Sequence, residues 1–452
     1  MIFHRLLRAV LITISVMLSC ACGGEPQAAS LLSDSFVQRI ATDGPGVPIV
    51  VFNPLSWQRT DAVEVDTPFP GESPYVKITD SAGRAYPART LGDTLYFTAR
   101  NVPALGYRVF WASRAQAPVP TAIKCTADAV ENQYFRVTVD RKIAAITGIY
   151  DKANRRRLMP TGAKVALPQL LRGSNVLQTA GKGTTVMMDS GPARGMLVLD
   201  SSLDKGPFVQ RLILREGVPR VDIELASEWV QSPVSGQPPA QVRACIPTVF
   251  DSFKPESGGM ELTRNGAAVP SLRWLDLSDG KYGVSLVADS AYDISATKGS
   301  MCAILRKQGD PLPAGRAWEV DYSIFTHSGN WAKGRVFQRS LEVANPLIAR
   351  FTTRHKGDLP RTYSMFSYTH DKIIAVFLPA ETPTGAPLIR FYNMRADYSS
   401  ARVNIGIPGI KLTPADQSGK PLPGVRAIIE HSFTLNLPAN SSAVYVFGWQ
   451  AF

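Results

Sequence analysis

Hydrophobic and polar residues alternate through most of the chain from residue 49 onward. Short runs rich in β-branched and aromatic residues are separated by Gly, Pro, Asn and Asp, as expected for strands joined by turns. Residues 134–140 are an example, because Phe135, Val137 and Val139 fall on one face of an extended segment. The pattern predicts β-strands through most of the chain.

Two local patterns are more specific. Between residues 31 and 40, Leu32, Phe36 and Ile40 recur at every fourth position, which predicts a short amphipathic helix. Residues 208–214 and 221–225 flank a Glu-Gly turn and predict a β-hairpin. In the second strand of that hairpin, the alternation predicts that Asp222 and Glu224 face water.

Strands that alternate apolar and polar residues favour antiparallel sandwiches. We therefore predict an all-β, multi-domain fold of antiparallel β-sandwiches. The content of 35 Gly and 34 Pro agrees with many turns. Proline-containing segments at 115–120 and 345–346 suggest domain boundaries. Inspection of the sequence finds no internal repeat.

The first 21 residues are typical of an export signal. Arg5 and Arg8 precede an apolar run from Ala9 to Leu18 that is too short to span a bilayer. Cleavage before Cys22 would release a periplasmic or secreted protein. Alternatively, Cys20 lies in an imperfect lipoprotein motif and is a lipidation candidate, which would anchor the chain in the envelope. We expect contact with a membrane only through such an anchor.

Three further cysteines, Cys125, Cys245 and Cys302, are too widely spaced for a zinc ribbon or a dense disulfide framework. One long-range disulfide is an option, and three buried thiols are the alternative. The net charge of +12 includes no basic helix or aromatic-interleaved basic patch, so we expect no nucleic-acid partner. Phosphate-binding, dinucleotide-binding, nucleophile-elbow and zinc-protease motifs are missing. We expect no metal site and no cofactor in this chain.

A series of short segments, in order along the chain, resembles the C-terminal β region of glycoside hydrolase family 38, the α-mannosidases. The segments lie at residues 50–61, 102–107, 131–137, 149–152, 274–286, 304–306, 327–331 and 389–393. Together they extend over about residues 30 to 450. One departure is Ala144, where a glycine is expected in a tight strand connection.

The resemblance implies a domain organisation. Residues 1–21 are the signal peptide, 22–45 a linker with a short helix, and 46–118 an Ig-like β domain. Residues 121–345 correspond to a galactose-mutarotase-like supersandwich, and 346–452 to a C-terminal β-sandwich. In the family, the nucleophile and a zinc ion belong to an N-terminal catalytic domain that has no counterpart here. No catalytic residue is therefore transferable, and zinc is expected only in that missing domain.

Three functions follow as hypotheses. The chain is the non-catalytic half of a split α-mannosidase that works with a separate catalytic polypeptide, or a carbohydrate-binding scaffold of the cell envelope. The third hypothesis is an independent glycosidase or lyase that uses the supersandwich. The expected ligand is a carbohydrate, specifically a mannoside.

Carbohydrate binding requires aromatic platforms with polar neighbours. His327, Asn330 and Trp331 lie within five residues of one another and are the main candidates. Arg306 and Trp274 are secondary candidates. Burial in a sandwich core is the alternative interpretation of both tryptophans. Residues 155–157, three consecutive arginines, could meet a phosphate, a carboxylate or a partner surface, or form a solvated loop.

Overall fold

The structure is a computed structural model of the chain. It describes residues 32–69, 75–160, 162, 168–173, 175–179, 183–203, 206–228, 235–249, 256–257, 260–261, 274–288, 294–297, 299–309, 318–368, 373–378, 386–393, 397–439 and 441–449. The predicted signal segment, including Cys20, lies outside these residues. No helix of the described part is long and apolar enough to cross a membrane.

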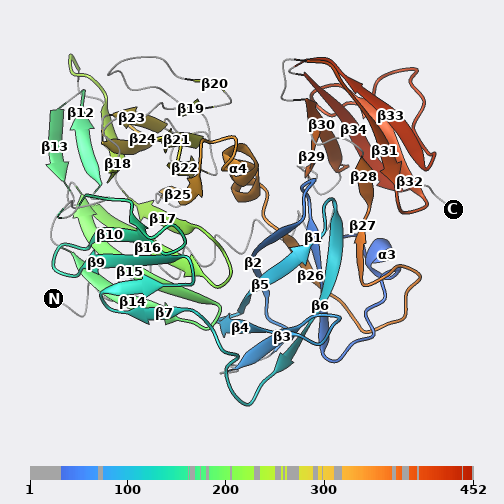
Figure 1. Ribbon diagram of the computed structural model, residues 1–452, viewed down its shortest axis with the longest axis horizontal. Coiled ribbons are helices and arrows are strands. Elements are labelled where there is room, and N and C mark those ends of the chain that lie inside the picture. Colours follow the sequence, from blue (N-terminus) through green and yellow to red (C-terminus); the bar gives the residue numbers. More distant parts are fainter. Residues whose placement is uncertain are drawn as a thin grey trace. The chain divides into compact units, whose positions relative to one another are not determined.

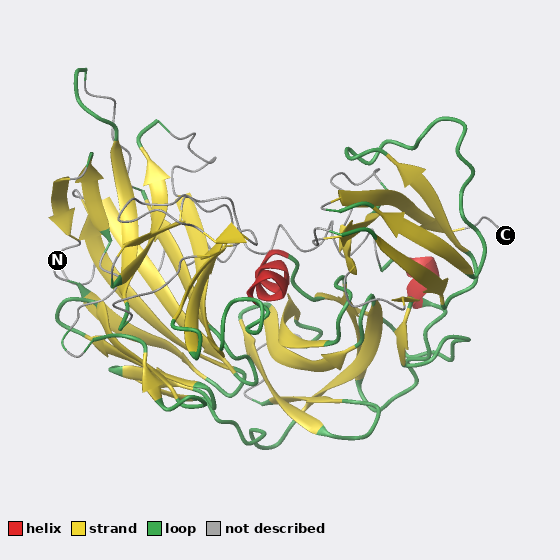
Figure 2. Ribbon diagram, turned by 45° about the horizontal axis from the view of Figure 1, so that its top comes forward, coloured by secondary structure: helices red, strands yellow, loops and turns green. Residues whose placement is uncertain are grey.

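The described chain is built almost entirely from antiparallel sheets (Figures 1 and 2). It divides into two units: residues 1–119 with 345–452, and residues 120–344. Every pair of named strands in the described part is antiparallel, so the predicted all-β fold of antiparallel sandwiches is confirmed. The predicted helix is present only as the short α3 (Asp34–Val37), which contains Phe36. Leu32 and Ile40 flank this helix, and all three side chains are buried in the core of the first unit.

The first unit contains an eight-stranded sheet and two smaller sheets. The strands of the eight-stranded sheet are β1 (Val47–Asn53), β2 (Arg59–Asp66), β3 (Val76–Thr79), β4 (Ala85–Leu91), β5 (Thr94–Val102), β6 (Gly106–Arg114), β26 (Ile348–Phe351) and β27 (Thr362–Ser364). The strands of the smaller sheets are β28 (Phe366–Tyr368), β29 (Ile373–Leu378), β30 (Leu388–Asn393), β31 (Ser399–Ile405), β32 (Ile410–Ala415), β33 (Ser432–Leu437) and β34 (Ser441–Trp449).

The second unit contains one nine-stranded and two five-stranded sheets around a shared apolar core. The five-stranded sheets comprise β7 (Lys124–Thr126), β8 (Ala129–Glu131), β9 (Phe135–Asp140), β10 (Ala145–Asp151) and β11 (Arg156–Arg157), and β12 (Gln169–Arg172), β13 (Asn175–Thr179), β18 (Ala240–Pro247), β23 (Ile294–Thr297) and β24 (Ser300–Lys307). The nine-stranded sheet comprises β14 (Thr184–Ser190), β15 (Arg194–Leu203), β16 (Gly206–Arg215), β17 (Val221–Ser227), β19 (Glu256–Ser257), β20 (Met260–Glu261), β21 (Trp274–Ser278), β22 (Tyr282–Ala288) and β25 (Trp318–Ser328). Helix α4 (Val336–Ala344) follows.

The local predictions for this unit hold at two places. Strand β9 buries Phe135, Val137 and Val139. Strands β16 and β17 pair as the predicted hairpin. Ala144, at the expected glycine position, has a φ of 49°, in the left-handed region where alanine is strained.

Of the two options for the cysteines, the structure forms the long-range disulfide. Cys245 and Cys302 face each other on β18 and β24 and are bonded, across a sequence separation of 57 residues. Cys125 stays a free thiol, and burial raises the pKa of its thiol to about 11. At neutral pH it is therefore protonated and a poor nucleophile.

The first unit contains a structural repeat that the sequence does not show. In the first copy, β26, β1, β6 and β3 are neighbours in that order and β2 pairs with β5. In the second copy, β29, β30, β34 and β32 are neighbours in that order and β31 pairs with β33. The strand register is also matched, because Asn53 faces Gly106 in the first copy as Asn393 faces Ser441 in the second. The repeat escapes inspection because few residues are identical and because the second unit separates β26 from the rest of the first copy.

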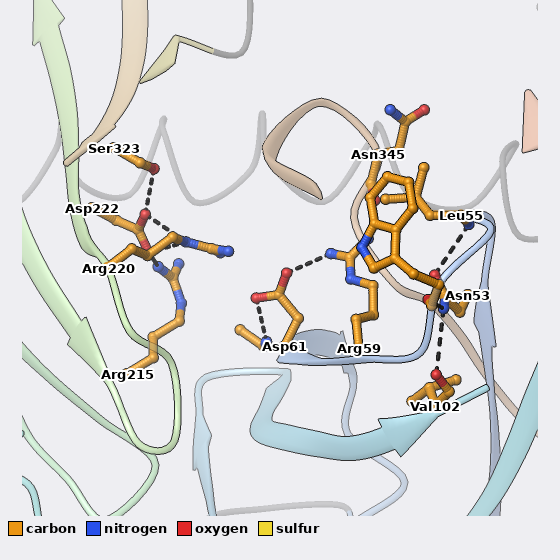
Figure 3. Close-up of polar contacts among 12 residues, drawn as sticks. Asn53, Leu55, Arg59, Asp61, Val102, Arg215, Arg220, Asp222, Ser323 and Asn345 are labelled. Carbon is orange, nitrogen blue, oxygen red and sulfur yellow. Dashed lines mark hydrogen bonds and ion pairs between the residues drawn. The ribbon is translucent and has the colours of Figure 1, made fainter. Parts of the chain in front are cut away.

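The clearest shared feature is an asparagine at the end of the β1 and β30 strands. Asn53 Nδ2 donates to the carbonyl oxygens of Trp57, Val102 and Pro103, at 2.7, 3.3 and 3.0 Å (Figure 3). Asn393 Nδ2 donates to the carbonyl oxygens of Asp397, Leu437 and Pro438, at 2.7, 3.2 and 2.9 Å. In each copy one buried amide satisfies three carbonyl groups where two strands end.

Candidate functional site

One face of the nine-stranded sheet carries a buried group of polar and aromatic residues. Strand alternation sends Leu275 and Leu277 of β21 into the shared core, and therefore turns Trp274 and Asp276 to the opposite face. The strand register places Asp276 directly opposite Ser285 on β22. These residues lie on three adjacent strands, β21, β22 and β25, because His327 faces Gly283 across β22 and β25.

Asp276 is the centre of the polar part. Its Oδ1 accepts a hydrogen bond from Ser285 Oγ at 2.6 Å and lies 2.7 Å from His327 Nε2. All three side chains are buried. His327 Nδ1 is buried and makes no hydrogen bond within the described structure.

The imidazole of His327 is held between two glycines. A Cβ atom on Gly283 would lie 2.2 Å from His327 Cε1, and one on Gly334 would lie 2.3 Å from His327 Cγ. Neither position can carry a side chain unless the ring moves. The sequence therefore needs glycine on β22 and in the loop before α4 for this histidine to occupy its place.

An aromatic patch adjoins the histidine. The rings of Trp274 and Trp331 lie 5.5 Å apart. Trp274 and Phe325 pack with Val336 of α4 in a small apolar cluster, with Trp331 at its edge. Helix α4 thus covers this part of the sheet face, and Trp274 is only 3% exposed.

The structure brings three of the five predicted binding residues together. His327, Trp274 and Trp331 belong to this group, and Trp331 is half-buried. Asn330 is an exposed neighbour in the same loop, where its Oδ1 accepts a hydrogen bond from the Lys333 backbone at 3.1 Å. Trp331 and Asn330 are therefore the members that reach the surface.

Arg306 lies elsewhere in the second unit, on β24 of a five-stranded sheet. Its guanidinium carbon is 5.9 Å from the centre of the Trp318 ring, and its side chain is largely buried. This placement is a cation–π contact in the core rather than part of the group around His327.

The Asp276 group cannot act as a nucleophile triad. In such a triad, the histidine contacts the nucleophile through one ring nitrogen and the carboxylate through the other. Here Ser285 and His327 both contact the same oxygen of Asp276. Ser285 is therefore not activated by the histidine, and the geometry supports a structural role for the buried network.

Sequence reasoning missed a second polar group on the same sheet face, in β16, β17 and β25. The prediction that Asp222 faces water is wrong, because Asp222 is 8% exposed. It forms ion pairs with Arg215 and, at 2.8 Å, with Arg220, and it accepts a hydrogen bond from Ser323 Oγ at 2.5 Å (Figure 3). These partners offset the cost of its burial.

A neighbouring ion pair joins Arg211 Nη1 to Glu224 Oε2 at 3.3 Å. Glu224 is half-buried rather than fully exposed to water. Burial raises the pKa of Glu319, and Glu224 adds to that rise, while Arg211 opposes it. The opposite charges at facing positions of the predicted hairpin were the signal in the sequence, because cross-strand neighbours of opposite charge pair.

Within the described residues, no group of three or more His, Cys, Asp or Glu side chains is placed to hold a metal ion.

No protein-family model matches the sequence, and no curated protein matches it. Among solved structures, the chain is similar to an α-mannosidase from Enterococcus faecalis V583, with 13% identity and a TM-score of 0.63 over 91% of this chain and 57% of that chain. It is equally similar to a protein in the glycosyl hydrolase family 38 from Enterococcus faecalis, with 13% identity and a TM-score of 0.62 over 91% of this chain and 60% of that chain. A galactose mutarotase-like protein from Lactobacillus casei ATCC 334 matches with 10% identity and a TM-score of 0.30 over 44% of this chain and 99% of that chain.

The chain therefore spans about 57 to 60% of the length of the two Enterococcus proteins that it matches. At 13% identity this likeness is one of fold. The resemblance seen in the sequence is confirmed at that level: the chain has the fold of the matched part of these α-mannosidase-type proteins.

Proposed function

We propose that the chain is an exported carbohydrate-binding protein that supplies the β-sandwich part of an α-mannosidase-type assembly. In this proposal, a separate polypeptide carries the catalytic domain and its zinc, and the ligand is a mannoside. The observation that carries the proposal is the fold match over 91% of this chain to proteins described as an α-mannosidase and as a family 38 glycosyl hydrolase.

The disulfide supports export. Disulfides persist in oxidising compartments such as the periplasm and the cell exterior. The Cys245–Cys302 bond joins directly opposed residues of two strands, so the fold accommodates it without moving either strand. This agrees with the export signal expected at the N-terminus.

For sugar binding, we assign the surface around Trp331 and Asn330. Trp331 offers a half-buried aromatic ring, and Asn330 offers an exposed amide one residue away. An aromatic face packs on the C–H patches of a pyranose, and an amide bonds its hydroxyl groups. The buried His327 holds the loop from below and is a positioning residue in this proposal.

Calorimetric titration of the full chain with manno-oligosaccharides tests the binding. We expect saturable binding that Trp331→Ala and Asn330→Ala each weaken roughly tenfold. Tyr398→Ala is the matched control, because Tyr398 is an exposed aromatic residue of the first unit, 61% accessible. Since Trp331 also packs on Trp274, the unfolding midpoint of each variant is measured alongside. Binding unaffected by both loop variants would place the sugar elsewhere and contradict the assignment.

An activity assay tests the division of labour. The purified chain alone should release no p-nitrophenol from p-nitrophenyl α-mannoside. Addition of the polypeptide that co-purifies with it, if that polypeptide carries an α/β catalytic domain, should restore release. Turnover by the chain alone would refute the non-catalytic role while leaving the carbohydrate ligand in place.

A further inference from the structure

The sheet formed by β7, β8, β9, β10 and β11 has one face that carries exposed side chains. Its inner face carries residues such as Val130, Phe135, Val137 and Ile149, which are buried in the core of the second unit. Alternation therefore turns the intervening residues outward. The outer face is accordingly polar, and its composition is the basis of the inference.

One line of cross-strand neighbours runs over the whole outer face. The strand register places Lys124 opposite Glu131, Glu131 opposite Arg136, Arg136 opposite Tyr150, and Tyr150 opposite Arg157. We call these five residues the basic row. Adjacent strands lie about 4.8 Å apart. The two arginines thus flank the tyrosine, about 10 Å from each other.

The members of the basic row are accessible. Tyr150 is 38% exposed, and Lys124, Arg136 and Arg157 are exposed as well. Tyr150 is one of few large aromatic side chains in the described structure that present so much surface. An exposed ring between two guanidinium groups is not required by the core beneath it.

The charge of this region is concentrated. Residues 121–160 contain eight Lys and Arg and four Asp and Glu, a net charge of +4, against +12 for the whole chain. The single carboxylate of the basic row, Glu131, is neutralised by Lys152 Nζ at 2.5 Å and lies 3.9 Å from Arg136 Nε. Its hydrogen bond with Lys152 lowers the pKa of Glu131, despite the opposing effect of burial.

The remaining charges leave the row positive. Asp151 is buried and bonded to Asn154 and Tyr282, so it does not face the ligand. Arg157 forms no ion pair within the part of the chain that the structure describes. The face therefore carries a net positive charge, with a guanidinium group on each side of an aromatic ring.

We propose that the basic row binds an acidic polysaccharide, one whose sugars carry carboxylates. A guanidinium group matches a carboxylate with two parallel hydrogen bonds, so Arg136 and Arg157 bind acidic groups along one polymer chain. The Tyr150 ring packs against the C–H face of the sugar between them. Arg155, which belongs to the same run of arginines, adds to the long-range attraction, whereas Arg156 is paired with Asp279 at 3.7 Å.

A carboxylated glycan fits better than a nucleic acid. Single-stranded nucleic acids are bound by several stacked aromatic platforms along a basic groove. The basic row has one ring on an open sheet face. The disulfide also favours an oxidising compartment, where polysaccharides rather than nucleic acids are the abundant polyanions. This site is independent of the mannoside site proposed above, because its residues lie on a different sheet.

Affinity measurement of the full chain with three polymers tests the proposal: polygalacturonate, neutral mannan and single-stranded DNA. We expect polygalacturonate to bind at about 50 mM salt and to weaken at about 300 mM, because salt screens the exposed charges. Substitutions in the basic row should leave the affinity for mannan unchanged. A failure of mannan binding would affect the proposed mannoside function only, so the two proposals stay distinguishable.

Substitutions locate the site. The double variant Arg136→Gln with Arg157→Gln should lower the affinity for polygalacturonate about tenfold or more, and Tyr150→Ala roughly fivefold. Arg354→Gln and Tyr398→Ala, at exposed positions of the first unit, are the matched controls and should leave it unchanged. Absence of polygalacturonate binding at low salt overturns the proposal. Equal losses in the controls, or equally tight DNA binding through the same residues, also overturn it.

Discussion

The two sandwich copies of the first unit keep the same backbone interactions but differ in whether an additional strand joins their sheets. Both end a strand at an asparagine that satisfies three carbonyl groups. Both also turn at an aspartate: Asp80 Oδ1 accepts from the backbone N–H groups of Ala82 and Arg84, and Asp416 Oδ1 from those of Ser418 and Lys420. These shared contacts all satisfy the backbone.

The cores correspond as well. Phe97 and Phe110 lie 5.8 Å apart in the first copy, and Phe433 and Tyr445 lie 5.6 Å apart in the second. The pairs come from corresponding strands, β5 with β6 and β33 with β34. An aromatic pair between the two strands is therefore part of the common design.

The copies diverge after the aspartate turn. In the first, β4 bridges β3 and β5, and Tyr86 is buried with its hydroxyl bonded to Asp80 Oδ2 at 2.8 Å. In the second, no strand of the described residues joins β32 to β33, and residues 421–426 are exposed, among them Leu422 and Val425. The two copies thus share their backbone hydrogen bonds at the asparagine and the aspartate, whereas among the described residues only the first has a strand between its third strand, β3, and β5. In the second, residues 421 and 428 form isolated bridges to β32.

The largest expected difference lies in the aromatic pairs. Phe110→Ala should lower the free energy of unfolding by about 4 kcal/mol, because Phe110 is fully buried. Tyr445→Ala should cost about half as much, since Tyr445 is only half-buried. Urea denaturation of the full chain measures both. Equal losses would show that the second core is packed as tightly as the first.

The aspartate turns should respond unequally. Asp80→Ala leaves the Arg108 guanidinium, which donates to Asp80 Oδ2 at 2.8 Å, without its partner in a buried setting. We expect a loss of about 3 kcal/mol. Asp416→Ala should lower the protection from hydrogen exchange only at the backbone amides of this turn, because Asp416 is exposed. A comparable global loss in both variants would refute the distinction between the turns.

The two asparagines should respond equally. Asn53→Ala and Asn393→Ala each leave buried carbonyl groups without a donor, and both side chains are buried. We expect about 2 kcal/mol for each. Asn154→Ala, at a turn of the second unit, serves as a control for asparagine removal at a more exposed position. A large inequality between Asn53 and Asn393 would contradict their structural equivalence.

Acid should act on the first copy more than on the second. Burial alone would raise the pKa of Asp80, but hydrogen bonds from Tyr86 and from the backbone lower it overall. The Ser418 hydroxyl and backbone N–H groups lower the pKa of Asp416. A lowered folded pKa means that the stabilisation is complete above about pH 4 and is lost as the pH falls through the folded value.

Asp80→Asn should therefore flatten the acid limb of the stability curve between about pH 4 and pH 2, and Asp416→Asn should flatten it less. Thermal unfolding across that range measures the slopes. An acid limb that neither substitution changes would assign the acid sensitivity to other carboxylates.

The smallest effects are expected in the uncovered segment. Leu422→Ser and Val425→Ser should change the free energy of unfolding by less than about 0.5 kcal/mol, because both side chains are already exposed to solvent. Tyr86→Ser, near the corresponding position of the first copy, should cost about 3 kcal/mol. A marked loss in the Leu422 variant would show that residues 421–426 are packed in solution.

Much of the architecture was predictable from local pattern. Alternation identified the faces of β9 and the β16–β17 hairpin, because a strand places successive side chains on opposite sides. The family resemblance, rather than local pattern, implied a glycine at position 144, and the φ of 49° there is one that glycine adopts readily. The strand predictions held because they depend on a few neighbouring residues.

The arrangement of the polar residues was not predictable. The sequence pattern predicted that Asp222 faces water. Alternation alone does not show that Arg215, Arg220 and Ser323 contact its carboxylate. Similarly, Arg306 and Trp331 were grouped by residue type, yet Arg306 lies on β24 of a five-stranded sheet and Trp331 lies in the turn before α4. Long-range pairing decides such neighbours, and the sequence spacing between them is uninformative.

The sequence alone determined that this protein is built from antiparallel β-strands, that two of its cysteines could form a long-range disulfide, and that it carries an excess of positive charge. Local periodicity and turn chemistry act over a few residues, which is why these properties can be deduced without a structure. Only the tertiary structure revealed the duplicated sandwich and the contact between Asp276 and His327, which are 51 residues apart in the sequence. The same holds for the basic row, which has one residue on each of five strands. Each of these depends on strand register, which is determined by how distant segments pack against one another.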